Sequence, residues 1–310
     1  MNADTAAEHR ALIYSGPEEF LATVVPYLRA GLARGERALV LADPEKQELL
    51  RSALGDDAGA VEFTDAGLTG QRQAQVIQAV IDRVINGHCT RIVAEHALAR
   101  RSPREVDDYL RFEAAWNVAF RTCPISILCP YDASALPADV VLGCQRTHPA
   151  LAGEHRTEPS GQFVDPSGYI AGSCVVSEPP SSADTFLCQA KADLTTARAF
   201  ARSHATRAGL GTQATAELSL AVSEVLTNAL HYGKPPRYLY AYAEGPMLVC
   251  HVHDSGDGPG NPLASYLPPG TGPVPGRGLW VARQFCDSLE IATNATGTHV
   301  RLFTLPWAPR

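Results

Sequence analysis

Hydrophobic and polar positions in the first half of the chain alternate between two patterns. Short apolar runs lie at residues 11–14, 37–42, 61–63, 91–95 and 125–129. Longer segments with helical periodicity separate these runs, and the clearest is 71–85, where apolar residues recur every three or four positions. Strands that alternate with helices of this length predict an α/β fold with a doubly wound, mostly parallel sheet.

The turn after the first apolar run limits what this sheet can bind. The order of elements is similar to that of RecA-like sheets, but residues 15–19 read Ser-Gly-Pro-Glu-Glu. A P-loop needs a glycine-rich turn with a Lys, and two carboxylates would repel phosphate. We therefore expect a RecA-like sheet without a P-loop, whose ligands bind beyond the carboxyl ends of the strands.

The second half of the chain follows a different order. Helical periodicity covers residues 195–208 and 213–231, and two hairpins are expected at 237–252 and 288–305. Between the hairpins, residues 259–275 are rich in Pro and Gly and have no hydrophobic period. A segment of this length without a period is typical of a lid over a binding site.

A short polar segment separates the two patterns. Residues 177–184 are rich in Ser and Pro, which is typical of a semi-rigid linker. A length of 310 residues fits two domains. We therefore predict a first domain at 1–176 and a second at 185–310.

Charge and leader patterns restrict the partners of the chain. The first 176 residues carry the whole formal net charge of −7, and the remainder is balanced. Because no basic stripe is present, binding to nucleic acid is disfavoured. The sequence has neither a signal-peptide pattern nor an apolar run long enough to span a bilayer, which favours a cytoplasmic protein without a membrane partner.

Two polar residues lie one turn apart on the predicted helix at 213–231. Glu224 and Asn228 are four residues apart, so they project from the same side of the helix. An amide oxygen there can take one coordination position on Mg²⁺, and a carboxylate can polarise a hydroxyl that attacks phosphate. Such pairs also occur on solvated helix faces, so the interpretation depends on the segments that follow.

The strand that ends the first hairpin runs into a glycine-rich turn. Asp254 comes at the strand end, and Gly256 and Gly258 follow at alternating positions. Glycines let the backbone approach a flat ligand, and the carboxylate can then accept a hydrogen bond from the exocyclic amine of adenine. A solvated hairpin loop is the alternative interpretation.

A second pair of glycines opens the next predicted helix. Gly276 and Gly278 would present bare N–H groups and the positive end of the helix dipole to phosphate. Arg277 between them is either a further phosphate contact or a surface charge. Thr298, in the last hairpin, is placed to reach the adenine edge.

In this order, the three segments resemble the N, G1 and G2 boxes of the GHKL ATPase domain, specifically of the RsbW-type anti-sigma factor serine kinases. The resemblance covers about residues 185–307 and implies an α/β sandwich. It also implies that Glu224 is the general base, that Asn228 holds Mg²⁺ and that Asp254 binds adenine. The remaining positions that it assigns to the ATP site are Gly256, Gly258, Gly276, Gly278 and Thr298.

The first domain resembles the MEDS sensory domain over about residues 8–170. The segments that carry this resemblance are His9–Tyr14, Glu95–His96, Phe112–Asn117, Cys129–Asp132 and Thr147–Pro149. The resemblance implies a sensor of a small molecule or of redox state, and it does not specify the ligand.

The eight cysteines form no CxxC pattern. Free cysteines are most often small buried apolar residues. The alternative is a metal or redox site in which some of the first domain's cysteines and histidines converge, and these are Cys89, Cys123, Cys129, Cys144, His88, His96 and His148. Cys129 is the first candidate because the pattern places it at a strand end.

These expectations together describe a sensor-regulated anti-sigma regulatory factor that binds ATP and Mg²⁺. It would phosphorylate a Ser or Thr of a STAS-type antagonist or sequester a sigma factor. A homodimer is one alternative for its oligomeric state, which the sequence leaves open. The alternative is a non-catalytic module whose ATP holds a partner-binding shape. A histidine kinase is disfavoured because no helical segment with a phosphoacceptor His precedes the ATP domain.

Overall fold

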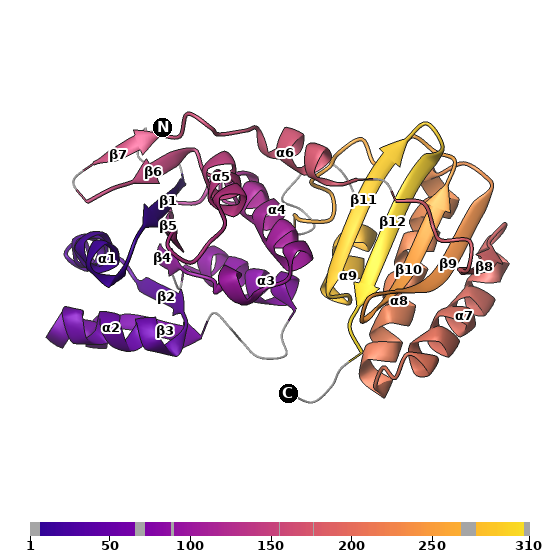
Figure 1. The fold of residues 1–310 in the computed structure, drawn as a ribbon, viewed down its shortest axis with the longest axis horizontal. Helices are drawn as coiled ribbons and strands as arrows, with labels where there is room; N and C mark the ends of the chain where they lie inside the picture. Colours follow the sequence, from indigo (N-terminus) through magenta and orange to yellow (C-terminus); the bar gives the residue numbers. More distant parts are fainter. Residues whose placement is uncertain are drawn as a thin grey trace. The chain divides into compact units, whose positions relative to one another are not determined.

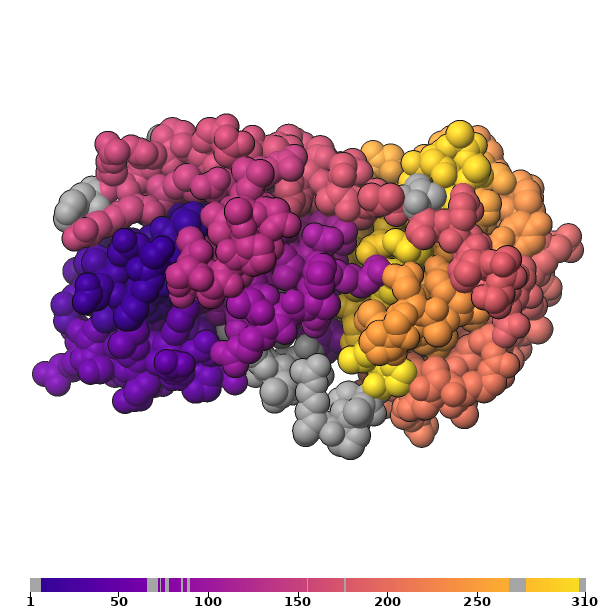
Figure 2. Space-filling model, viewed as in Figure 1, coloured from indigo at the N-terminus to yellow at the C-terminus, as the bar shows by residue number. Residues whose placement is uncertain are grey.

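The computed structural model describes residues 7–65, 72–87, 90–154, 156–175, 177–267 and 277–306. The chain forms two compact units, which divide after Tyr169, and the short segment 72–75 belongs with the second. Figure 1 shows one sheet in each unit, and Figure 2 shows one face of the same structure in space-filling form. No helix in the described ranges is long and apolar enough to cross a membrane.

The first unit is built on a seven-stranded sheet with the order β3-β2-β4-β5-β1-β6-β7. Every neighbouring pair is parallel except β6 and β7. The strands are β1 (Glu8–Tyr14), β2 (Ala38–Ala42), β3 (Val61–Asp65), β4 (Arg91–Ala94), β5 (Ser126–Asp132), β6 (Ala150–Ala152) and β7 (Thr157–Pro159). The predicted mostly parallel sheet is confirmed.

Helices lie on both faces of this sheet (Figure 1). They are α1 (Pro17–Leu32), α2 (Pro44–Leu54), α3 (Gln73–Ile85), α4 (Pro103–Ala119) and α5 (Ala138–Thr147), with 3₁₀ turns at Gly55–Ala60 and Leu98–Arg100. The division between the two units falls within α6 (Pro166–Ser173). Apolar side chains of α1 and α2, such as Phe20 and Leu50, form a core with Leu12 and Val40 of the sheet. Ser102 begins α4 with a capping box, in which its side chain and that of Glu105 bond each other's backbone N–H groups.

The second unit has a five-stranded antiparallel sheet with the order β11-β12-β10-β9-β8. Its strands are β8 (Asp184–Leu187), β9 (Arg237–Glu244), β10 (Met247–Asp254), β11 (Ser288–Asn294) and β12 (Gly297–Thr304). Its helices are α7 (Leu194–Arg207), α8 (Thr212–Tyr232) and α9 (Arg277–Gln284), after a 3₁₀ turn at Lys191–Asp193. The three helices share one core with the sheet, which includes Ala201, Val222 and Ala282 from the helices and Cys250 and Leu302 from the strands. This two-layer arrangement is the expected α/β sandwich.

Five short elements were not expected from the sequence. They are α5, α6, β6, β7 and β8. In β8, Asp184 is the last residue of the predicted linker, so regular structure begins inside that segment. The strands β6 and β7 have three residues each, which is too short to show alternation.

Candidate functional site

The helix α8 carries the first pair of predicted site residues. One face of α8 is apolar and buried, and it includes Leu218, Val222 and Val225. Glu224 and Asn228 are half-buried beside that face. A Cβ atom added to Gly278 of α9 would lie 3.0 Å from Glu224 Oε2 and 3.0 Å from Asn228 Nδ2. The start of α9 therefore lies directly against both side chains.

Asp254, the last residue of β10, is the most buried carboxylate of this site, with 6% of its surface exposed. Its Oδ1 accepts hydrogen bonds from the backbone N–H of Gly256 at 2.7 Å and of Lys234 at 3.2 Å. Within the described parts of the chain both bonds reach Oδ1, so Oδ2 is left for a ligand. The two backbone bonds also fix the direction of the carboxylate.

Close contacts around the end of β10 leave no room for a side chain at Gly233 or Gly258. A Cβ on Gly233 would lie 2.4 Å from Asp254 Cγ. Gly258 has φ of 75°, and a Cβ there would lie 2.2 Å from Thr293 Oγ1. The loop after β10 is therefore held against the end of α8 and against β11.

Thr298 supports the same loop from the neighbouring strand. The register of β10 with β12 places Thr298 opposite Asp254. Its buried hydroxyl donates a hydrogen bond to the carbonyl oxygen of Gly256 at 3.0 Å. The Thr298 hydroxyl can still accept a hydrogen bond from a ligand, because its oxygen keeps two lone pairs when the O–H donates.

A cavity of about 270 Å³ lies among these elements. Its polar lining includes Asn228, Asp254, Asn261 and Thr298, and its apolar lining includes Val225, Val252, Leu279, Ile291 and Val300. Sites for whole cofactors or drug-sized ligands are usually larger, roughly 300–1,000 Å³. This cavity therefore suits one flat ring with a polar edge, and Asp254 is the acceptor for that edge.

Of the predicted site residues, Asn228, Asp254, Gly258 and Thr298 line this cavity, whereas Glu224, Gly256 and Gly278 are not among its lining residues. Gly276 lies outside the described residues. Arg277 is the first residue of α9, and its side chain is exposed.

The predicted lid at 259–275 is described only as far as Leu267. Within that part, Ser265 and Tyr266 are buried. Arg283 of α9, which the sequence analysis did not identify, is 2% exposed and donates to Ser265 Oγ and, at 2.5 Å, to the carbonyl oxygen of Leu289. Its guanidinium lies 3.8 Å from the centroid of the Tyr266 ring, so it anchors the beginning of the lid segment.

Gly233 was also not identified as a site residue from the sequence. It is the C-cap of α8, and a glycine after a helical pattern signals a helix end in any protein. Its contact is with Asp254, a strand residue 21 positions later (254 − 233), so a local pattern could not show it.

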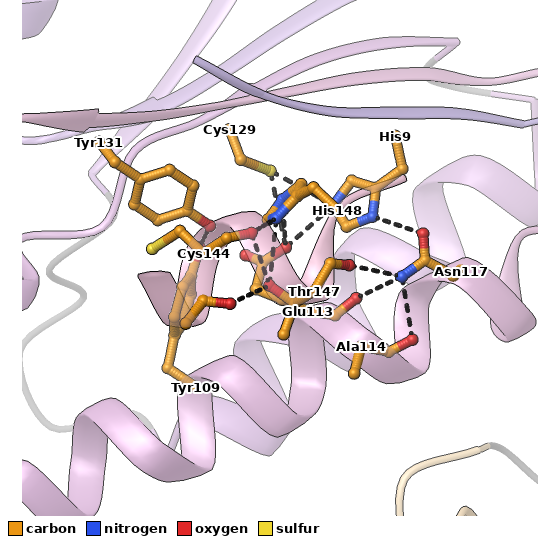
Figure 3. A network of polar contacts seen from close by, with 11 residues as sticks. His9, Tyr109, Glu113, Ala114, Asn117, Cys129, Tyr131, Cys144, Thr147 and His148 are labelled. Atoms are coloured by element: carbon orange, nitrogen blue, oxygen red, sulfur yellow. Dashed lines mark hydrogen bonds and ion pairs between the residues drawn. The ribbon is translucent and has the colours of Figure 1, made fainter. Parts of the chain in front are cut away.

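The cysteines and histidines of the first unit converge only in part. Cys129 and His148 lie together in the core with two residues that the sequence analysis did not name for this role, His9 and Glu113 (Figure 3). Cys144 lies nearby on α5 (Figure 3), whereas Cys123 and His96 are not part of this group. His88 and Cys89 lie outside the described residues.

The predicted position of Cys129 at a strand end is wrong. The strand β5 continues to Asp132, so Cys129 lies in its interior and is fully buried. Burial, and then the Glu113 carboxylate, raise the pKa of the Cys129 thiol well above its ordinary value. Because the thiolate is the reactive form, this environment disfavours direct oxidation of Cys129.

Comparison with known families gives a match for each half of the chain. Residues 8–149 match the family described as MEthanogen/methylotroph, DcmR Sensory domain (MEDS). Residues 188–304 match the histidine kinase-like ATPase domain. None of the curated proteins matches the chain significantly.

Among solved structures, one similar chain contains the RsbU and RsbW domains of Rv1364c from Mycobacterium tuberculosis. The two share 20% identity with a TM-score of 0.31. The similarity covers 41% of this chain and 33% of that one, so the chain spans about a third of that structure's length.

Proposed function

Because the chain carries a MEDS domain followed by a histidine kinase-like ATPase domain, we propose that it is a sensor-regulated ATP-binding factor of the anti-sigma type. Its second domain binds ATP with Mg²⁺ and phosphorylates a Ser or Thr of a STAS-type antagonist, or captures a sigma factor. Its first domain receives a small-molecule or redox signal. The chain acts in the cytoplasm in this proposal.

The observation that carries ATP binding is the arrangement around Asp254. A buried carboxylate with one oxygen left over lies at the edge of an apolar cavity that fits a single ring. The exocyclic amine of adenine is a donor of the kind that this oxygen needs, and the apolar walls suit the faces of a purine. Gly256 and Gly258 shape the loop, and Thr298 holds it in place.

The position of α9 supports a role for Glu224 and Asn228 at the phosphates. Gly278 lies against both side chains, and the first N–H groups of α9 have no partner within the helix. Phosphate is favoured at such a helix start, and Gly276 and Arg277 would add contacts there. In this proposal Asn228 is a ligand of Mg²⁺, and Glu224 takes the proton of the attacking hydroxyl.

Phosphoryl transfer is tested with the full chain, labelled ATP, Mg²⁺ and a STAS-domain antagonist. Glu224→Gln should transfer label at least about a hundredfold more slowly, which is the usual loss for a missing general base. ATP affinity should change little, because the general base does not hold the nucleotide. Glu217→Gln is the matched control, since the same substitution lies two turns earlier on α8.

The outcomes separate a kinase from a binding module. The kinase is supported if wild type transfers label, Glu217→Gln also does so, and Glu224→Gln does not. ATP binding without transfer to any antagonist would instead make the domain a non-catalytic module, whose nucleotide stabilises a partner-binding shape.

A further inference from the structure

We propose that the core of the first unit is a site for one tetrahedral Zn²⁺ ion. Its four ligands are the side chains of His9, Glu113, Cys129 and His148. Each of these side chains is buried, and their ligand atoms all lie within 4.8 Å of one another (Figure 3).

The fold brings these residues together from four places in the chain. His9 lies on β1 and Cys129 on the neighbouring β5, where the register pairs Ala11 with Cys129. Side chains two positions apart on a strand share a face, so His9 and Cys129 point to the same side of the sheet. Glu113 comes from α4, which covers that face, and His148 is the C-cap of α5.

Hydrogen bonds turn the ring of His9 so that its Nε2 faces the centre of the group. The Nδ2 of Asn117 donates to the carbonyl oxygens of Glu113, Ala114 and Thr147. Its Oδ1 therefore faces His9 Nδ1, at 3.0 Å, and Nδ1 must be the donor. The neutral ring then presents the lone pair of Nε2 to the centre.

His148 is oriented in the same way by a different partner. Its Nδ1 lies 2.7 Å from the carbonyl oxygen of Cys144, which can only accept. Nδ1 therefore carries the proton, and the Nε2 lone pair faces the same centre. Bonds of this kind from the second ring nitrogen are a regular feature of metal-ligating histidines.

Without an ion, the four side chains bring together more hydrogen-bond acceptors than donors. Both Nε2 atoms face one oxygen of Glu113, at 2.9 Å for His9 and 3.3 Å for His148. A single added proton can bridge only one of these pairs. Within the described residues, His148 Nε2 is a buried atom without a hydrogen-bond partner, which is costly for a polar atom removed from water.

Three of the six separations between the ligand atoms match the edges of a tetrahedron, and all six are within 4.8 Å. Bonds of about 2.0–2.3 Å to zinc give ligand-to-ligand edges of about 3.3–3.7 Å. The Cys129 sulfur lies 3.5 Å from His9 Nε2 and 3.6 Å from Glu113 Oε2, and Oε2 lies 3.3 Å from His148 Nε2. The edge between His9 and Glu113, at 2.9 Å, needs to lengthen by a few tenths of an ångström.

The charges and the ligand types favour zinc over other divalent ions. One thiolate and one carboxylate neutralise Zn²⁺, so the buried site has no net charge. Binding breaks the S–H bond of Cys129, forms a bond from sulfur to zinc and releases one proton to solvent. Thiolate and imidazole ligands disfavour Mg²⁺ and Ca²⁺, which prefer oxygen. Because all four positions belong to the protein, the ion would hold elements together rather than activate water.

The test begins with wild-type full-length protein without an affinity tag, dialysed against Zn²⁺ and then against buffer. Elemental analysis should find about one zinc per chain. X-ray absorption at the zinc edge should show one sulfur at about 2.3 Å and three nitrogen or oxygen ligands at about 2.0–2.2 Å. Protein reloaded with Co²⁺ should show the visible bands of a tetrahedral ion and a thiolate-to-cobalt charge-transfer band.

Variants then assign the ion to this group. Cys129→Ser should abolish the charge-transfer band, and His148→Gln should lower zinc affinity by at least about tenfold. Cys144→Ser is the matched control, because Cys144 is as fully buried as Cys129 but is not a ligand. It should keep both the metal content and the band.

Wild type alone can overturn the proposal even if a core variant fails to fold. Absence of zinc after loading, absence of a tetrahedral cobalt spectrum, or a coordination shell without sulfur would each contradict it. If Cys129→Ser and His148→Gln both keep the metal content and the charge-transfer band unchanged, the ion binds elsewhere and the proposal is overturned.

Discussion

The two units of this chain place their polar side chains in opposite ways. In the second unit, Asp254 and Asn228 line a cavity, and one oxygen of Asp254 is left for a ligand. In the first unit, the ligand atoms of His9 and His148 turn inward toward Glu113, inside the core. A lined cavity suits a ligand that enters and leaves, such as a nucleotide, whereas a sealed group suits an ion that stays.

The same comparison separates two ways of orienting a carboxylate. Backbone N–H groups hold Asp254, and those contacts depend on glycines that let the chain approach closely. Side chains from distant elements surround Glu113, whose Oε2 lies 2.9 Å from His9 Nε2 and 3.3 Å from His148 Nε2. The first arrangement is sensitive to backbone substitution, and the second is sensitive to loss of a side chain.

The largest expected effect comes from a backbone substitution beside Asp254. Gly297 has φ of 137°, and a Cβ there would lie 2.0 Å from the carbonyl oxygen of Asp254. Gly297→Ala should therefore lower the free energy of unfolding by about 3 kcal/mol. Gly245→Ala is the control, because Gly245 also has positive φ but open space around it, and it should cost about 1 kcal/mol. Urea unfolding measures both, and equal losses would show that the close approach is unimportant.

The second effect is a loss of stability in acid that both units should share. Burial lowers the pKa of His251 in the second unit to about 3 and that of His96 in the first to about 4. The unfolded chain takes up these protons near pH 6.5, so the stabilisation is present above that pH. It falls by about 1.4 kcal/mol per pH unit for each histidine as the pH drops toward the folded pKa.

Between pH 6.5 and 5, each buried histidine should therefore cost about 2 kcal/mol. Hydrogen exchange on peptides from each unit measures the loss separately. His251→Gln should flatten the pH dependence in the second unit only, and His96→Gln in the first only. The exposed His231→Gln is the control. A pH dependence that neither core variant changes would rule out this origin.

The smallest expected effect is a difference in stability between two cysteine variants, both measured in the presence of a chelator. Cys250 lies in the apolar core of the second unit, so Cys250→Ser should cost about 2 kcal/mol for an unsatisfied hydroxyl. Cys129 lies among polar atoms, and the serine hydroxyl of Cys129→Ser can donate to Glu113. The free energy of unfolding lost in Cys129→Ser should therefore be about 1 kcal/mol smaller than that lost in Cys250→Ser. Equal losses in urea unfolding would contradict the polar character of the first site.

Much of the second unit could be predicted from the sequence because its motifs are local. Glu224 and Asn228 are one helical turn apart, and Asp254 and Gly258 belong to one loop. The contact of Gly233 with Asp254 and the anchoring role of Arg283 depend on how separate elements pack. A local pattern contains no information on such contacts, so these two residues were missed.

In the first unit the sheet could be predicted, whereas the polar group could not. Each strand and helix has its own hydrophobic periodicity, so the alternation of the two could be read from the sequence. That alternation predicts a parallel sheet. The four residues of the group are separated by 16 to 120 positions along the chain where they contact. His9 has no neighbouring Cys or His in sequence, and it joins the group only because β1 pairs with β5.

Calorimetric titration of the full chain with ATP and Mg²⁺ tests the central claim most directly. Wild type should bind one nucleotide, and Asp254→Asn should bind about tenfold to a hundredfold more weakly, because an amide in place of the carboxylate loses a charged hydrogen bond. Asp257→Asn is the control, since Asp257 lies in the same loop but is exposed and paired with Lys234. It should bind ATP like wild type. An absence of heat with wild type, or equal affinities for wild type and Asp254→Asn, would contradict the assignment of the cavity as an adenine site.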